Sequence, residues 1–194
     1  MDEMLALFQS GLREFGARVD AIDEGQWDGP TPNTEWSVTD LVDHVVDENR
    51  WVPPLVHGHD LDAAGKIVEG AAARNDATMA SHLAAEWADV ARACADAFGE
   101  HGALDRSVSL SRGPTPASQY LVEMLFDLIV HSWDLGKAIG YTDALPEDAV
   151  AFLYEQVKAM GDMSGSGMFA APVPVPDDAP TIDKLVALTG RNPR

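Results

Sequence analysis

The sequence predicts an all-α protein, a four-helix bundle with an extended, proline-rich C-terminal arm. Three observations lead to this fold class. Four long segments carry apolar residues at three- and four-residue steps, which is the spacing of amphipathic helices. The interruptions between these segments are rich in glycine, proline and other turn residues. Only one short segment alternates with the period of a strand, and a lone strand cannot form a sheet.

Length and composition describe one domain of an ordinary globular kind. The chain has 194 residues, of which 46% are hydrophobic and 23% charged, and no apolar run approaches membrane-spanning length. We expect a single domain over residues 1–194, with the bundle at about 1–161 and the arm at about 162–194. The acidic N-terminus is unlike a secretory signal, so a cytoplasmic location is expected.

The charge balance excludes several classes of partner. The chain has 32 acidic and 13 basic residues, a formal net charge of −19 that repels nucleic-acid phosphates and anionic lipids. We therefore expect no nucleic-acid or membrane partner. A homodimer formed through a bundle face is compatible with the pattern, although no residues mark an interface. The lone cysteine, Cys94, lies among helical apolar positions and is expected to be a small buried residue.

The first two helices of the bundle are predicted in the N-terminal half. Apolar spacing places the first helix over about residues 1–24 and the second over about residues 38–51. Ser37 is a suitable N-cap for the second helix, and Pro53-Pro54 should kink or end it. The loop between the two helices, residues 25–36, consists largely of turn residues.

The other two bundle helices follow later in the chain. An alanine-rich segment at about residues 76–98 restores helical spacing. The fourth helix is expected at about residues 116–139, because Thr115 followed by Pro116 is a favourable helix start and Gly140 a favourable stop. Shorter elements are expected elsewhere: some short helix within 55–75, an extended segment at 106–111, a further helix at 146–160 and a last helical turn at 182–189.

The fourth helix carries a narrow polar stripe between large apolar residues. Its members are Glu123, Asp127, His131 and Asp134. Asp127 and His131 are one helical turn apart, so their side chains could reach a common metal ion. The competing interpretation is the solvated face of an ordinary amphipathic helix, and the spacing alone does not decide between the two. Chance also produces such pairs easily in an acidic chain, since Asp40 and His44 repeat the spacing.

The second helix supplies one more candidate ligand, His44. Alone, a histidine at a helix border is more often hydrogen-bonded or hydrated than a metal ligand. If His44 faces the stripe, then His44, Asp127 and His131 form a set of two histidines and one carboxylate that leaves coordination positions open. Asp134 would then orient an imidazole, and Glu123 would be solvated. His57 and His59, on a glycine-flanked loop, are expected to be exposed.

Three segments resemble a known family. They are residues 34–45 (TEWSVTDLVDHV), residues 127–140 (DLIVHSWDLGKAIG) and the ending FAAPV at 169–173 through LVALTGRNP at 185–193. In this order they are similar to the DinB-like superfamily, and more closely to its mycothiol-dependent maleylpyruvate isomerase N-terminal branch and the allied metal-binding proteins. The resemblance spans nearly the whole chain.

The resemblance implies a DinB-like four-helix bundle that holds a divalent metal, often zinc or nickel. The ligands of the family match His44, Asp127 and His131. Family members of known activity are thiol-dependent enzymes, in which the metal activates the sulfur of a low-molecular-weight thiol such as mycothiol toward an electrophilic substrate. The resemblance therefore implies a metal- and thiol-dependent transferase or isomerase with a small-molecule thiol and an electrophile as partners.

Two departures from the isomerase pattern bear on the reaction. The isomerase motif has glutamate at the position of Asp127, and the separate C-terminal domain of the isomerase has no counterpart in this sequence. These departures favour the shared metal- and thiol-dependent chemistry over maleylpyruvate isomerisation itself. The alternatives are a non-catalytic metal- or small-ligand-binding protein and a structural helical interaction protein.

Overall fold

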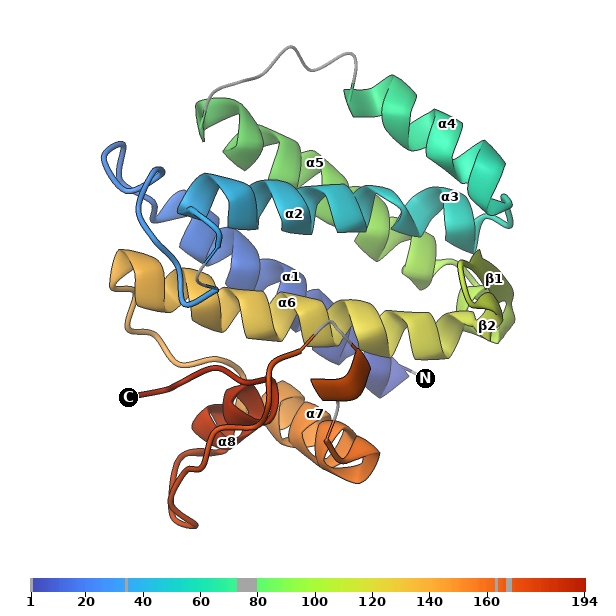
Figure 1. Cartoon of the computed structure of the whole chain (residues 1–194). Helices are drawn as coiled ribbons and strands as arrows, with labels where there is room; N and C mark the ends of the chain where they lie inside the picture. Colours follow the sequence, from blue (N-terminus) through green and yellow to red (C-terminus); the bar gives the residue numbers. More distant parts are fainter. Residues whose placement is uncertain (1, 34, 73–79, 163, 167–168) are drawn as a thin grey trace.

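The fold is almost entirely helical (Figure 1). The computed structural model describes residues 2–33, 35–72, 80–162, 164–166 and 169–194. No helix in these ranges is long and apolar enough to cross a membrane. The elements in chain order are α1 (Asp2–Asp20), α2 (Val38–Arg50), α3 (Val52–Val56), α4 (Leu61–Ala72), α5 (Ala80–Gly99), the 3-10 turn η1 (Ala103–Asp105), β1 (Ser107–Leu110), β2 (Gly113–Pro116), α6 (Ala117–Ile139), α7 (Glu147–Met160), the 3-10 turn η2 (Ser164–Ser166) and α8 (Thr181–Leu188).

Helices α1, α2, α5 and α6 pack as a bundle, and this confirms the predicted fold class. Helix α6 lies against α1 and α2, and α5 contacts the same two helices (Figure 1). After Trp51 the short helix α3 continues beyond α2, with the two prolines in its first turn, where missing N–H groups cost nothing. Helix α4 contacts α3 at the edge of the bundle.

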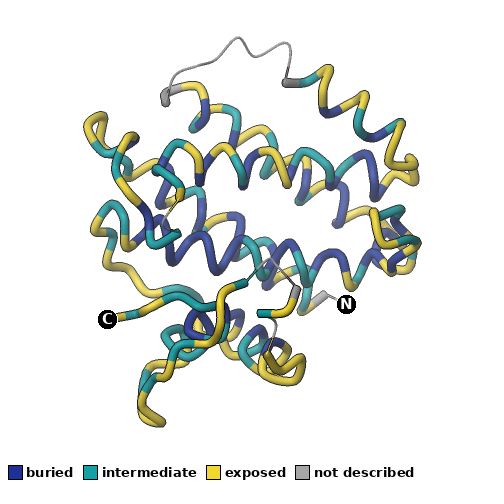
Figure 2. The backbone as a smooth tube through the Cα atoms, viewed as in Figure 1, coloured by how far each residue is buried: buried dark blue, intermediate teal, exposed yellow. Residues whose placement is uncertain are grey.

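The core lies between the apolar faces of these four helices (Figure 2). The largest fully buried side chains include Phe8 and Phe15 of α1, Leu41 of α2, and Leu125 and Leu128 of α6. Residues 128–136 of α6 are buried without interruption, so this helix runs through the interior. Any polar side chain in that stretch must find a partner inside the protein, because leaving it unpaired and dehydrated is costly.

A short hairpin precedes α6, and it corrects one prediction. The extended segment predicted at 106–111 is found as β1, which pairs antiparallel with β2. Thr115 and Pro116 were expected to start the helix, but Thr115 lies opposite Val108 in the hairpin and Pro116 has extended backbone angles. Helix α6 therefore begins at Ala117. The dipeptide suits both a helix start and a strand end, and pairing with β1 decides between them.

The start of α2 is fixed by Ser37 as N-cap, as the sequence predicts, and Asp40 completes a capping box. The Ser37 side chain accepts a hydrogen bond from the Asp40 N–H, and the Asp40 carboxylate accepts one from the Ser37 N–H. The preceding loop is tied down by an isolated bridge between Pro30 and Ser37 and by a hydrogen bond from Val38 N to Gly29 O. These bonds fix the loop that carries Trp36, whose ring contacts one residue of α2 and one of α6.

Other helix ends differ from prediction by a few residues. Helix α1 ends at Asp20 rather than near residue 24, because Ala21 and Ile22 donate to the third carbonyl back in a closing turn. Helix α6 ends at Ile139 as predicted, with Gly140 at φ +75° as its C-cap. The predicted start of the third long helix near residue 76 lies outside the described residues, and α5 is described from Ala80.

The C-terminal segment folds back onto the bundle. Helix α7 packs on α1, and α8 packs on α7. Val173 N donates to Ala187 O at 2.9 Å, so the proline-rich stretch runs beside the end of α8. Beyond α8, the Lys137 ammonium reaches Pro193 O at 3.5 Å, and this contact brings the tail to α6.

Candidate metal centre

Helices α2 and α6 bring His44, Asp127 and His131 together. One ligand atom from each residue lies within 4.8 Å of the other two. Asp127 Oδ1 is 3.3 Å from His131 Nε2 and 3.7 Å from His44 Nε2. The i, i+4 spacing on α6 aligns the first pair, and the packing of α2 on α6 supplies the third residue. The three residues selected from the sequence therefore form one cluster.

The donor atoms of this cluster fit a divalent transition metal. Asp127 Oδ2 is buried and has no hydrogen-bond partner among the residues that the structure describes. A dehydrated carboxylate oxygen without a donor is costly unless a cation or a ligand meets it. Two imidazole nitrogens and one carboxylate are ligands that zinc and nickel accept, and three protein ligands leave room for a further one.

Ionisation in the cluster is strongly coupled. Burial by itself would raise the pKa of Asp127, but His131 and His44 beside it hold that pKa well below its usual range. Burial by itself would lower the pKa of His131, yet the charges and hydrogen bonds of Asp127 and Asp134 outweigh it and raise that pKa to about 9. Without a metal, the His131 ring is therefore protonated at neutral pH, and both neighbouring carboxylates are ionised.

Asp134 contacts His131 from the side opposite Asp127. The Asp134 carboxylate is fully buried, and His131 Nδ1 lies 3.0 Å from its Oδ2. A ring whose Nδ1–H donates to Asp134 presents Nε2 to Asp127 and His44, which is the orientation a metal ligand needs. Hydrogen bonds from His131 and Arg191 keep the pKa of Asp134 low despite the opposing effect of burial. Asp134 is therefore placed where it can orient the His131 imidazole, which is the role predicted for it.

Two further residues of the site do not follow from the sequence patterns considered above. The ring of Trp36 contacts both imidazoles: it stacks on His131, with centroids 5.7 Å apart, and lies tilted against His44, with centroids 4.5 Å apart. Arg191 donates to both oxygens of Asp134 from 57 residues away in the sequence. A tryptophan directly before the N-cap of the His44 helix could have indicated the first. Local spacing carries no information about the second, because its partner is distant in the chain.

The remaining candidates lie outside the cluster. Glu123 accepts hydrogen bonds from Arg112 on the protein surface and is 38% exposed, as expected for a solvated residue. His57 and His59 are exposed, again as expected, and His57 contacts Glu100 at 3.0 Å. Glu48, one turn after His44 on α2, has a raised pKa because of desolvation and the nearby charge of Asp127.

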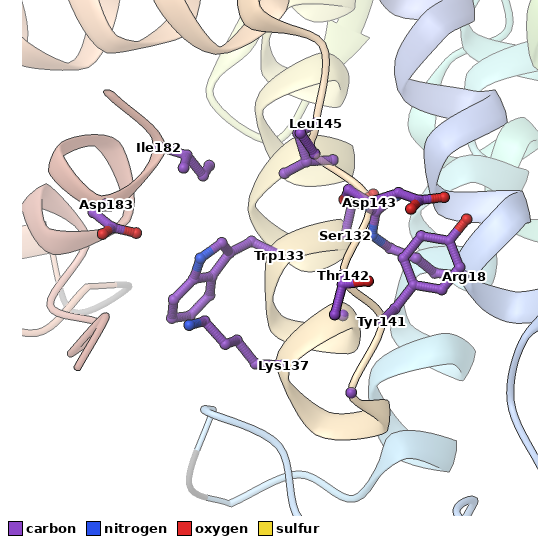
Figure 3. A pocket seen from close by; sticks show the side chains of 13 residues that line it. Arg18, Ser132, Trp133, Lys137, Tyr141, Thr142, Asp143, Leu145, Ile182 and Asp183 are labelled. Atoms are coloured by element: carbon purple, nitrogen blue, oxygen red, sulfur yellow. Dashed lines mark hydrogen bonds between the residues drawn. The ribbon is translucent and has the colours of Figure 1, made fainter. Parts of the chain in front are cut away.

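A cavity of about 420 Å³ lies on the side of α6 that faces away from His44, Asp127 and His131. Figure 3 shows the side chains that line it. Gly136 lines it, about half a helical turn around α6 from the ligand face. Trp133 and Lys137 project from α6 toward α8 (Figure 3). Arg18 lies beside Tyr141 and Asp143, which belong to the segment that connects α6 to α7. None of the three cluster residues lines this cavity.

Comparison with solved structures shows a shared fold. The crystal structures of a mycothiol-dependent maleylpyruvate isomerase and of its histidine-to-alanine mutant both match with a TM-score of 0.62. The matches cover 80% of this chain and 68% of the isomerase chain, at 17% and 18% sequence identity. At that identity the match establishes the arrangement of helices alone.

Comparison of sequences establishes the family. Two uncharacterized proteins from two strains of Mycobacterium tuberculosis are each 32% identical to this chain over the full length of both. The family model described as the mycothiol maleylpyruvate isomerase N-terminal domain matches residues 8–136, a span that includes His44, Asp127 and His131. The chain therefore belongs to the mycothiol maleylpyruvate isomerase N-terminal domain family.

Proposed function

We propose that this protein binds a divalent metal, zinc or nickel, at His44, Asp127 and His131 and uses it in thiol-dependent chemistry on a small electrophile. The observation that carries the proposal is the cluster itself: three ligand atoms within 4.8 Å of one another, beside a buried carboxylate oxygen with no partner among the described residues. The three protein ligands found among the described residues suit a catalytic site better than a closed structural one, which usually has four.

The side chains around the cluster have separable roles in this proposal. A divalent ion in such a site stabilises a bound thiolate and so supplies a strong nucleophile at neutral pH. Asp134 holds the His131 ring in place through Nδ1, at 3.0 Å. The Trp36 ring lies against both imidazoles and occupies part of the space beside them. The protein thus supplies the ligands and their orientation.

The thiol is the finer part of the proposal, and family membership supports it. The family and the structural neighbours are named for mycothiol-dependent maleylpyruvate isomerase. We therefore propose mycothiol, or a similar low-molecular-weight thiol, as the second partner, with transfer or isomerisation of an electrophile as the reaction. A reducing compartment keeps such thiols free, so the cytoplasm is the proposed location.

Metal binding is the first test. Protein purified without an affinity tag should hold close to one equivalent of zinc or nickel, or take it up from solution, and lose it in the variant Asp127→Asn. That substitution keeps the shape of the side chain and removes its charge. The controls are His57→Ala and His59→Ala, which remove exposed histidines outside the cluster. Wild-type protein that binds no more metal than Asp127→Asn would overturn the proposal.

Thiol consumption is the second test. Metal-loaded protein is incubated with mycothiol, bacillithiol or glutathione and a panel of electrophiles that includes maleylpyruvate. We expect turnover with at least one pair, lost in Asp127→Asn and kept in His57→Ala. Metal binding without any turnover would instead identify a non-catalytic metal-binding protein. Absence of both would leave a structural helical protein.

A further inference from the structure

We propose that Arg191, in the tail after α8, is a positioning residue of the metal centre. It fixes the Asp134 carboxylate, which in turn fixes the orientation of the His131 ring. The inference rests on the proposed function for its consequence, metal affinity, but its geometry stands on contacts between the protein's own side chains. It makes the C-terminal segment a working part of a site whose ligands come from α2 and α6.

Arg191 holds both oxygens of Asp134 at once. Its Nε donates to Oδ1 at 2.8 Å and its Nη2 donates to Oδ2 at 2.7 Å. This two-pronged contact matches the planar guanidinium to the planar carboxylate and prevents the carboxylate from rotating. Arg191 is itself only 13% exposed and Asp134 is fully buried, so water competes poorly for either group. A buried carboxylate that lost this partner would keep its bond to His131 but lose the guanidinium charge that faces its other side.

The locked carboxylate determines which way His131 faces. Oδ2 of Asp134 accepts the bond from His131 Nδ1 at 3.0 Å, and Nε2 then lies 3.3 Å from Asp127 Oδ1. If Asp134 turned, the Nδ1–H would lose its acceptor, and the ring could tilt away from the other two ligands. Such outer partners of a ligating histidine influence metal affinity strongly in general.

The backbone of the tail is built to deliver Arg191 to this place. Gly190 N donates to Ala187 O and Arg191 N donates to Val186 O, the paired bonds of a Schellman turn at the end of α8. Gly190 has φ +84°, and a Cβ there would lie 2.5 Å from the Ala170 Cβ, so a side chain is excluded on both counts. The Thr189 hydroxyl accepts a further bond from Arg191 Nη1 at 3.0 Å.

Zinc affinity is the first readout of the experiment. Arg191→Gln removes the charge and one prong of the contact, and we expect about 10- to 100-fold weaker zinc binding by competition with a chromogenic chelator. Arg191→Lys keeps the charge without the planar fork and should weaken binding less. The matched control is Arg194→Gln, the same substitution at an exposed position of the same tail. Thermal unfolding followed by circular dichroism accompanies each variant.

The second readout needs no metal. In protein labelled with ¹⁵N-histidine, the buried Nδ1–H of His131 should give a downfield cross-peak, assigned by its absence in His131→Ala. We expect this peak in wild type and in Arg194→Gln, and its loss or a clear shift in Arg191→Gln. If Arg191→Gln fails to fold, Arg191→Lys takes its place. A merely structural role for Arg191 would change unfolding and leave the peak of the folded protein unchanged.

The two readouts separate this inference from the proposed function. Weakened zinc binding together with a changed cross-peak supports the positioning role. An unchanged cross-peak overturns it, and so does unchanged affinity in a wild-type background that binds zinc. If wild-type protein binds neither zinc nor nickel, the proposed function fails, and the cross-peak of the metal-free variants still decides whether Arg191 orients His131.

Discussion

His131 lies between two carboxylates, and this arrangement predicts that any metal binding at the cluster depends on pH. The pKa of its imidazole is raised to about 9, so below that pH a metal must displace a proton from the ring. Zinc affinity should therefore rise by about tenfold per pH unit from pH 7 toward 9. Chelator competition at several pH values measures it, and an affinity that is flat over this range would contradict the coupling.

The same raised pKa has the opposite effect on the metal-free fold. A protonated His131 stabilises the folded state fully below the ordinary histidine pKa of about 6.5, and this contribution disappears as the pH rises through about 9. Metal-free protein should lose stability over the interval in which metal affinity grows. Urea unfolding of metal-free wild type and His131→Ala at pH 6 and 9 shows the difference, because the variant lacks this contribution.

Cys94 is expected to be chemically inert in the folded protein. Its side chain is fully buried and its thiol donates to Asn49 O at 3.1 Å. Burial raises the pKa of this thiol far above its ordinary value, so the reactive thiolate is scarce. A thiol reagent at pH 8 should leave native protein unlabelled and label it fully in denaturant. Rapid labelling in native buffer would contradict this prediction. It would also mean that the Cys94 sulfur is accessible and could compete with the low-molecular-weight thiol of the proposed function.

At the scale of elements, Arg18 links α1 to the segment that joins α6 and α7. Its Nη2 donates to Asp143 O at 2.9 Å, its Nη1 donates to Glu14 at 2.7 Å, and the guanidinium lies over the Tyr141 ring. Arg18→Met keeps an apolar stem and removes these bonds, so we expect a loss of about 2 kcal/mol in the free energy of unfolding, measured in urea.

The control for Arg18→Met is the same change at Arg13, an exposed residue of the same helix. Because Arg18 lies across α6 from the ligand cluster, zinc affinity should stay within about twofold of wild type in both variants. Equal stabilities of the Arg18 and Arg13 variants would show that the buried guanidinium contributes nothing net. A large loss of zinc affinity would show that the two faces of α6 are coupled.

Helices were predictable from the sequence because their evidence is local. A stripe of apolar residues at helical spacing and an N-cap residue such as Ser37 require no knowledge of distant partners, and both the bundle and the start of α2 agree with prediction. Thr115-Pro116 failed for the complementary reason: the dipeptide is compatible with two local structures, and the pairing of Thr115 with Val108 selects the hairpin. Cross-strand pairing is not encoded in helical spacing.

The candidate site was predictable only in part for a similar reason. Asp127, His131 and Asp134 share one helical face, so their proximity follows from spacing alone. His44 required the assumption that α2 faces α6, and the contact between these helices agrees with it. Arg191 lies 57 residues after Asp134, in a tail whose path depends on α7 and α8. Whether the cluster binds a metal stays a prediction.

At the scale of the whole molecule, the surplus of negative charge should make stability depend on salt. With a net charge of −19, the acidic side chains repel one another, and this repulsion is strongest in the compact folded state. Raising sodium chloride from about 0.02 M to 0.3 M shortens the screening length to below ~10 Å and should raise the thermal midpoint by several degrees. Calorimetry of metal-free protein at both salt concentrations tests this. A midpoint that falls with salt would mean that attractive surface ion pairs, such as Arg112–Glu123, outweigh the general repulsion.

The contact of Trp36 with His44 and His131 also gives the protein an optical property. Among the five tryptophans of the chain, Trp36 lies against two candidate ligands, stacked on His131 and tilted against His44. The fluorescence of this indole should depend on the charge of the two neighbouring imidazoles and on any metal bound to them. A paramagnetic ion such as nickel would quench that fluorescence. Metal binding at the cluster could therefore be followed in real time by tryptophan fluorescence, with the variant Trp36→Phe as the control that lacks this signal.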